Sequence, residues 1–324
     1  MHAIMCIVGA CMGMYLAAAV QAQTPGETYP VKPVRIVVPY TPGGSNDILA
    51  RTVLAKAIAD MGQTTIVDNR AGGNTTIGTH LVARAAPDGY TLLTVDNAYT
   101  IGPSVQVNLQ YDTLKDFVRI TMLAMTSSVW VVHPSVPAKS VKELLALAKA
   151  QPGRLTYGST GSGTTGHLAF AQIRHVAGVD MVHVPYKGGA PQITALLSGE
   201  VSMLLSVPPA LLTHIKAGRM RALATSGEKR LPALPQTPTL REAGVPVAVE
   251  AFWGLNAPVG TPATIVNRLY ESIARALKAP ELRARLEDLQ LQPVGSTPAQ
   301  FEAFVQKEVT RWADVVKATG AKAE

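Results

Sequence analysis

Two glycine-rich turns, each placed between an apolar strand-like segment and a helix-like segment, constrain this chain most strongly. The first covers residues 39–47 after the apolar run 34–38, and the second covers residues 158–167 after residues 155–157. Such a turn directs free backbone N–H groups and the positive end of a helix dipole toward one point, which favours an anion. Two such turns far apart in the sequence predict two α/β halves that hold one anionic ligand.

Strand-like and helix-like segments alternate along the chain, with Gly and Pro at the joints. This alternation predicts an α/β fold whose mainly parallel sheets are flanked by helices. Residues 129–132 and 252–255 are extended and apolar without helical periodicity, so we expect the chain to cross between two lobes there. We predict a discontinuous first lobe of residues 31–126 plus 252–324, and a second lobe of residues 127–251.

Several helix starts are marked by capping signals. Ser140, Thr239 and Thr297 are each followed three residues later by Glu or Gln, which fits a capping box. Thr261 precedes Pro262, which fits a cap followed by proline at the first helical position. We therefore expect helices to begin at all four places, the last of them running over residues 298–317.

The N-terminal segment is predicted to be a signal peptide. Residues 3–20 are uncharged and mostly apolar, and Val20 and Ala22 suit a cleavage site after about Ala22. The absence of Lys and Arg before the apolar stretch argues against this interpretation. A membrane anchor and a lipoprotein modified at Cys11 are the alternatives. We favour a signal peptide over residues 1–22 and an exported protein.

Cysteine content and charge exclude several classes of function. Both cysteines, Cys6 and Cys11, lie in the predicted signal peptide, so the mature chain would have no thiol nucleophile, iron–sulfur cluster or cysteine-based zinc site. The formal net charge of +7 is spread over single Lys and Arg residues. Because no dense basic run interleaves with aromatic residues, we expect no nucleic-acid partner. We also expect no cofactor.

Three strand-end segments supply candidate ligand-binding residues, although ordinary tight turns remain the alternative for each. In the first turn, glycines allow close approach of the backbone, Ser45 or Asn46 can cap the next helix, and Asp47 complements its dipole. The second turn carries four hydroxyl side chains, and a third segment, residues 183–189, offers a phenol, a cation and two glycines. The candidates are Pro42, Gly43, Gly44 and Asp47, then Ser159, Thr160, Thr164 and Thr165, then Tyr186, Lys187 and Gly188.

A nucleotide site is a weaker interpretation of the second turn. Gly161, Gly163 and Gly166 match the dinucleotide pattern between a strand and a helix. The four hydroxyl residues of this turn, however, suit a small carboxylate better than a long pyrophosphate.

Hydrolase and metal sites are also weaker interpretations. Ser159, His167 and Asp180 can be combined into a triad on paper, but no serine here lies in a G-x-S-x-G elbow. His167, His175 and His183 recur every eight residues, yet the last falls in a predicted strand, so we expect no metal site. We expect His167 instead to bond nearby backbone at a helix start.

In its motifs the chain resembles the periplasmic receptors of tripartite tricarboxylate transporters, the Bug family. The matching stretches occur in order along nearly the whole mature chain and are highly specific together. They cover residues 37–44, 68–74, 86–92, 157–167, 183–189, 215–224, 238–244 and 257–262.

The resemblance implies a two-lobed periplasmic binding protein, a type II-like Venus flytrap that closes on a small organic carboxylate. It implies that backbone N–H groups and ordered water of the first turn hold one carboxylate, and that the other two segments hold the rest of the ligand. The implied binding residues are the candidates above together with Tyr40 and His167.

Two departures from the family pattern affect the expected ligand. Family members often have Asp where this chain has Ser206, and that acid would pair with a ligand ammonium group. We therefore favour an amine-free dicarboxylate, tricarboxylate or aromatic acid. Tyr99 lies in a segment that is usually richer in Gly, Asn and Thr, and we expect it to narrow the cleft or to stack on a ligand ring.

The expected function is capture of such an acid in the periplasm for a separate membrane permease, without catalysis. We expect the protein to be a monomer, because a flytrap needs no partner subunit to close. A sensor that docks on a membrane signalling protein needs the same cleft and is the alternative. An exported serine hydrolase is a weaker one.

Overall fold

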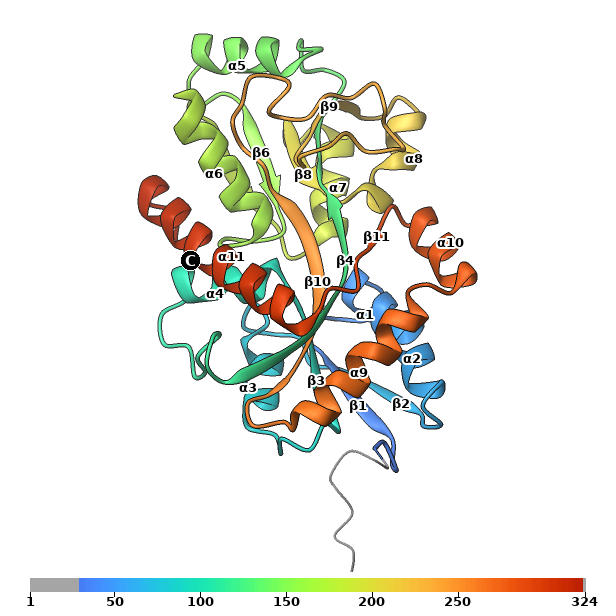
Figure 1. Cartoon of the computed structure of the whole chain (residues 1–324). Helices are drawn as coiled ribbons and strands as arrows, with labels where there is room; N and C mark the ends of the chain where they lie inside the picture. The colour runs from blue at the N-terminus through green and yellow to red at the C-terminus, as the bar shows by residue number, and fades with distance from the viewer. Residues whose placement is uncertain (1–28, 323–324) are drawn as a thin grey trace, which may run out of the picture.

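The computed structural model describes residues 29–322, and its strands form two separate sheets (Figure 1). The predicted signal peptide lies outside the described residues. The six-stranded sheet has the order β11-β4-β10-β3-β1-β2, and the five-stranded sheet has the order β7-β6-β8-β5-β9. The strands of the first are β1 (Val34–Val38), β2 (Thr65–Asn69), β3 (Thr91–Asp96), β4 (Phe117–Ser127), β10 (Glu250–Pro258) and β11 (Gln292–Pro293); those of the second are β5 (Val129–Val132), β6 (Thr156–Ser159), β7 (Val182–Pro185), β8 (Met203–Ser206) and β9 (Arg221–Thr225).

Both sheets are mixed, which corrects the expectation that each would be mainly parallel. β1 pairs in parallel with β2 and β3, and β6 pairs in parallel with β7 and β8. β10 pairs antiparallel with β3 and β4, and β5 pairs antiparallel with β8 and β9. The reason is the crossing itself: β4 passes into β5 through Ser128 alone, and β10 returns beside β4 in the opposite direction (Figure 1).

The helices follow the strands as the alternation predicts, and both sheets carry helices on their faces (Figure 1). The helix after the first turn is continuous over residues 45–59 but contains one π-helical turn, Ala50–Leu54. The helices are α1 (Ser45–Leu49), α2 (Ala55–Ala59), α3 (Thr76–Ala83), α4 (Asn97–Val105), α5 (Val141–Ala150), α6 (Thr165–Ala177), α7 (Gly189–Ser198), α8 (Leu212–Lys216), α9 (Ala263–Ala276), α10 (Pro280–Asp288) and α11 (Pro298–Thr319), with a short 3₁₀ turn at Pro208–Ala210. None of these described helices is long and apolar enough to cross a membrane.

The predicted helix starts are right in two cases. Thr297 forms the complete capping box with Gln300 at the start of α11, and the Ser140 side chain accepts the Glu143 N–H at the start of α5.

The other two predicted starts are wrong. Thr239 and Glu242 exchange the expected hydrogen bonds, but they close only a turn, because Gly244 (φ +85°) and then Pro246 end it. The helix near Pro262 begins one residue later, at Ala263. Thr261 donates to the Pro258 carbonyl instead of capping the helix.

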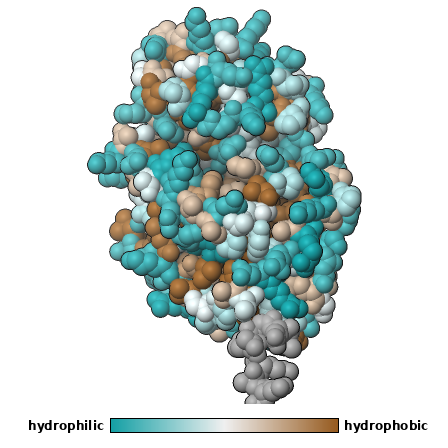
Figure 2. Space-filling view, viewed as in Figure 1, coloured by the Kyte–Doolittle hydropathy of each residue, from teal (hydrophilic) through white to brown (hydrophobic). Residues whose placement is uncertain are grey.

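Apolar clusters cover both faces of each sheet, and the long helix α11 joins two of them. Phe301 and Val305 lie in a cluster against the first sheet, whereas Trp312 lies among residues of the second sheet such as Trp130 and Tyr157. The surface in Figure 2 is mostly hydrophilic, with apolar residues in small groups. The division of the chain into two lobes remains a prediction, and α11 packs against both sheets.

Candidate ligand-binding site

A cavity of about 470 Å³ lies between the two sheets. Its walls come from the ends of β1, β3, β6 and β8, from the crossing strands, and from the helix starts that follow the strand ends. The carboxyl ends of parallel strands are the usual ligand site in open α/β sheets. The lining residues are Tyr40, Thr41, Gly44, Ser45, Asn46, Asn74, Asp96, Asn97, Ala98, Ser128, Thr160, Thr164, Thr165, Gly166, Gly188, Gly189, Leu205, Ser206, Val207, Ala251 and Trp253.

Four helix N-termini meet at this cavity. α1 contributes residues 44–46, α4 residues 96–98, α6 residues 164–166 and α7 residues 188–189. A helix N-terminus carries backbone N–H groups without helical partners and partial positive charge; at α4 the Asp96 side chain caps the terminus and takes the Ala98 N–H. Within the described part of the chain, no Lys, Arg or His lines the cavity, and Asp96 is its one carboxylate. Attraction for an anion therefore comes from backbone N–H groups and from neutral polar side chains such as those of Thr160 and Thr164.

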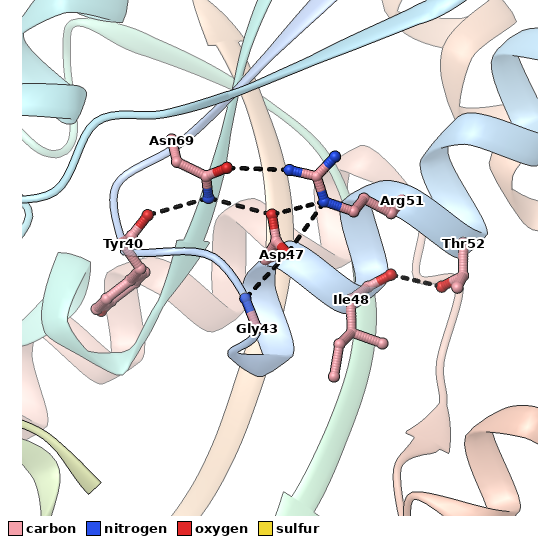
Figure 3. A network of polar contacts seen from close by, with 7 residues as sticks. All are labelled: Tyr40, Gly43, Asp47, Ile48, Arg51, Thr52 and Asn69. Atoms are coloured by element: carbon pink, nitrogen blue, oxygen red, sulfur yellow. Dashed lines mark hydrogen bonds and ion pairs between the residues drawn. The ribbon is translucent and has the colours of Figure 1, made fainter. Parts of the chain in front are cut away.

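Asp47 holds the first turn in shape through a network of polar contacts (Figure 3), and it is not among the residues that line the cavity. Its carboxylate accepts hydrogen bonds from the Gly43 N–H at 3.0 Å, from Asn69 Nδ2 at 3.1 Å and from Arg51 Nε at 3.0 Å. Burial raises the pKa of Asp47, but these donors outweigh it and hold the pKa below its usual value. The Gly43 N–H is thus committed to Asp47.

Asp96 ties together the turn after β1 and the start of α4. Its Oδ1 accepts from Tyr40 Oη at 2.8 Å and from the Ala98 N–H at 2.9 Å, and its Oδ2 accepts from Asn46 Nδ2 at 2.9 Å. Burial raises the pKa of Asp96 despite these donors. The proposed capping by Ser45 or Asn46 is wrong: Gly44 is the N-cap of α1, and the Asn46 amide binds Asp96 instead.

The second turn is built on buried side chains, and they correct the expectation that Ser159 binds the ligand. Ser159 is 0% exposed, and its Oγ lies 2.9 Å from the Gly161 carbonyl and 2.7 Å from His183 Nε2. It shapes the turn and does not face the cavity. Asp180 pairs with Arg174, so the hypothetical triad is not assembled.

The two histidines of this region stack on each other. His167 Nδ1 accepts the Gly163 N–H, as expected for a residue that bonds backbone at a helix start. The ring of His183 stacks on that of His167, with centroids 4.0 Å apart. Burial first, and then the nearby His167 and Arg174, lower the pKa of His183 to about 4. The described residues contain no cluster of three or more His, Cys, Asp or Glu able to hold a metal.

About half of the predicted binding residues line the cavity. Those that line it are Tyr40, Gly44, Thr160, Thr164, Thr165, Gly188 and Ser206. Those outside its lining are Pro42, Gly43, Asp47, Tyr99, Ser159, His167, Tyr186 and Lys187. The Tyr186 hydroxyl donates to Glu200, and the Lys187 side chain is exposed. Neither residue touches the cavity in this conformation.

Tyr99 is the clearest correction. It is 2% exposed, its hydroxyl donates to the Thr113 carbonyl, and Arg119 donates to its oxygen. Its ring packs edge-on against Phe117. Tyr99 lies on the face of α4 turned toward the core, so it neither narrows the cleft nor stacks on a ligand there.

Several lining residues were missed, and one of them carried a readable signal. Asp96 lies at the end of an apolar, strand-like run, as the first turn does, and parallel neighbours such as β1 and β3 end at the same edge of a sheet. No sequence signal marks Trp253 and Ala251 of β10 as lining residues. Trp253 reaches the cavity because β10 pairs antiparallel with β3, which places it opposite Asp96, 157 positions away in the sequence.

Comparisons with known proteins agree with this geometry. The profile "Tripartite tricarboxylate transporter family receptor" matches residues 49–321. The chain is 37% identical to protein BugT of Bordetella pertussis over 97% of both chains. Rpa4515 of R. palustris, solved with adipate, superposes with a TM-score of 0.83 at 33% identity, covering 91% of this chain and 99% of that one.

A second solved structure gives the same result. MatC from Rhodopseudomonas palustris, solved with bound malate, has a TM-score of 0.79 at 31% identity, covering 89% of this chain and 100% of the other. This chain therefore belongs to the tripartite tricarboxylate transporter receptor family, whose members are periplasmic solute-binding proteins.

Proposed function

We propose that this protein captures a small organic carboxylate by closing its two lobes on it, and delivers it as a monomer to a tripartite tricarboxylate-type membrane permease. The observation that carries the proposal is the meeting of four helix N-termini at one cavity whose described lining holds no basic side chain. Backbone N–H groups in this arrangement recognise a carboxylate without needing an arginine. Closure follows from tighter binding to the closed state than to the open one.

Dicarboxylates are the favoured class of ligand. Two similar proteins were solved with adipate and malate. Here Ser206 lines the cavity, and the family resemblance implies that an acid at this position would pair with a ligand amine. An amine-free acid is thus our first choice. Proton or acyl transfer is not part of the proposal, because Ser159 is buried and Asp180 is engaged elsewhere.

Calorimetry and thermal unfolding test the binding proposal. Adipate and succinate are compared with hexanoate, which has one carboxylate, and with hexane-1,6-diol, which has none. A ligand at about 100 times its Kd adds roughly 2.7 kcal/mol to the free energy of unfolding. We expect dicarboxylates to bind and the diol to give no signal. Equal binding of the diol, or turnover abolished by Ser159→Ala, would overturn the proposal.

Uptake measurements test the delivery. Cells lacking this gene should lose high-affinity uptake of the radiolabelled acid that the purified protein binds, and plasmid-borne protein should restore it. Tight binding by the protein with unchanged uptake in the deletion strain would contradict delivery to a permease and favour the sensor alternative.

A further inference from the structure

Tyr40, Asn46 and Asp96, here called the acceptor corner, form one wall of the cavity. They come from the turn after β1, from α1 and from the junction of β3 with α4. Asp96 accepts from all three places: from Tyr40 Oη, from Asn46 Nδ2 and from the Ala98 N–H. Three donors on separate elements fix the carboxylate in position, so it cannot swing away when a ligand enters.

Tyr40 and Asn46 each commit one polar hydrogen to Asp96. The Tyr40 hydroxyl has a single hydrogen, and Asp96 takes it, so the phenol oxygen can only accept. The Asn46 amide is oriented by the bond that one of its two hydrogens makes to Asp96, and its Oδ1 is buried with no hydrogen-bond partner. A carboxylate has about four acceptor sites, and these three bonds leave Asp96 capacity for another donor. Asp96 and the phenol oxygen of Tyr40 therefore offer acceptors and negative charge, which repel a carboxylate and attract a hydrogen-bond donor.

We infer that the acceptor corner is a subsite for a hydrogen-bond-donating substituent of the ligand. The helix N-termini hold the carboxylate, and Asp96 selects acids that carry a hydroxyl or ammonium group over the same acids without one. This inference rests on the proposed function. The inference adds Asp96 to the proposed function as a specificity-determining residue, because Asp96 is the one carboxylate among the described residues that line the cavity.

Calorimetry on two ligand series at pH 7.5 tests the inference. One series is succinate, malate and aspartate, and the other is adipate, 2-hydroxyadipate and 2-aminoadipate; within each, only the donor substituent changes. A hydrogen bond to a charged group corresponds to roughly tenfold or more in affinity. We therefore expect the hydroxy or the amino acid to bind at least about tenfold tighter than the unsubstituted one.

Variants assign the preference to Asp96. Asp96→Asn keeps the size of the side chain and the helix cap but introduces a hydrogen-bond donor. The affinity for the substituted acids should therefore fall, and the affinity for the unsubstituted acids should rise. Tyr40→Phe removes one of Asp96's donors and should keep the preference. Asp180→Asn, which changes an acid paired with Arg174 outside the cavity lining, is the matched control and should leave every affinity unchanged. If Asp96→Asn does not fold by circular dichroism, the wild-type and Tyr40→Phe series still decide the inference.

Each outcome has a definite meaning. Preference for the hydroxy acid or for the amino acid identifies which donor the corner takes, and the latter would replace the amine-free choice above. Equal or tighter binding of the unsubstituted acid in both series, or a preference that survives Asp96→Asn, overturns the inference and leaves the receptor function standing. No binding of any acid to the folded protein overturns both.

Discussion

Asp47 acts on the first turn rather than on the ligand, although the sequence places it among the binding candidates. Because it is nearly buried and joins Gly43, Asn69 and Arg51, Asp47→Asn should lower the free energy of unfolding by about 1–3 kcal/mol. The loss should be seen at neutral pH and should shrink as the pH falls through the lowered pKa of Asp47, where the wild-type carboxylate is also neutralised.

Urea unfolding measures this effect, and Asp60→Asn is the control. Asp60 pairs with Lys56 on the surface of the same helical segment, where an ion pair is worth about 0.5 kcal/mol or less. Equal effects of the two variants would show that the turn network adds nothing beyond a surface ion pair.

His183 gives the protein a second, separate dependence on pH. The pKa of His183 falls from 6.5 to about 4 in the folded state, through burial and then its neighbours His167 and Arg174. The unfolded chain therefore takes up a proton at higher pH than the folded chain does. This contribution to stability is complete above pH 6.5 and is lost as the pH falls from 6.5 toward 4.

Melting temperatures at pH 7.5 and 5.0 test this prediction. His183→Gln should lose less stability between the two pH values than the wild type does. His175→Gln, which removes an exposed histidine of α6, should behave like the wild type. An unchanged pH dependence in His183→Gln would contradict the assignment.

At the scale of elements, two adjacent glycines at the start of α1 are expected to have different roles, one in stability and the other in ligand binding. Gly43 has φ +96° and lies outside the cavity lining, whereas Gly44 has φ −79°, caps α1 and lines the cavity. Gly43→Ala should cost roughly 1–2 kcal/mol of stability through backbone strain. Gly44→Ala should cost less than about 1 kcal/mol. A Cβ there meets no atom within 4 Å, so its methyl group would take up space in the cavity that Gly44 lines.

Paired measurements on the two variants distinguish the roles. Gly43→Ala should melt earlier but bind the ligand normally once folded, and Gly44→Ala should melt like the wild type but bind about tenfold or more weakly. Reversed results, with Gly44→Ala unstable and Gly43→Ala deficient in binding, would place the ligand on the other side of this turn.

Elements whose signals are local could be predicted from the sequence, and those set by distant pairing could not. β1, β5 and the start of α11 match their predictions because burial, extension and capping are encoded within a few residues. Tyr99 was misplaced because which face of α4 packs on the core depends on Phe117 and Arg119 of β4. The sequence predicts a site at the first turn, but it does not predict that the Gly43 N–H donates to Asp47. That contact belongs to a network in which Asn69, from another strand, also donates to Asp47.

At the scale of the whole molecule, the two sheets are joined by crossing strands that are tied to each other. Ser128 and Ser226 exchange hydrogen bonds where the chain passes between the sheets, and Trp253 of β10 lines the cavity near this crossing. The other two tryptophans, Trp130 and Trp312, are 0% exposed in the apolar core. Closure about the crossing should therefore change the surroundings of Trp253 alone.

Tryptophan fluorescence and small-angle X-ray scattering together test this closure. The tightest acid from the binding screen should shift the emission and reduce the radius of gyration. The emission shift should vanish in Trp253→Phe and persist in Trp130→Phe and Trp312→Phe. The decrease in the radius of gyration should persist in each of the three variants that still binds the acid. Because a ligand stabilises closure only through its higher affinity for the closed state, tight binding with an unchanged radius of gyration would mean that the cavity is already in its binding conformation.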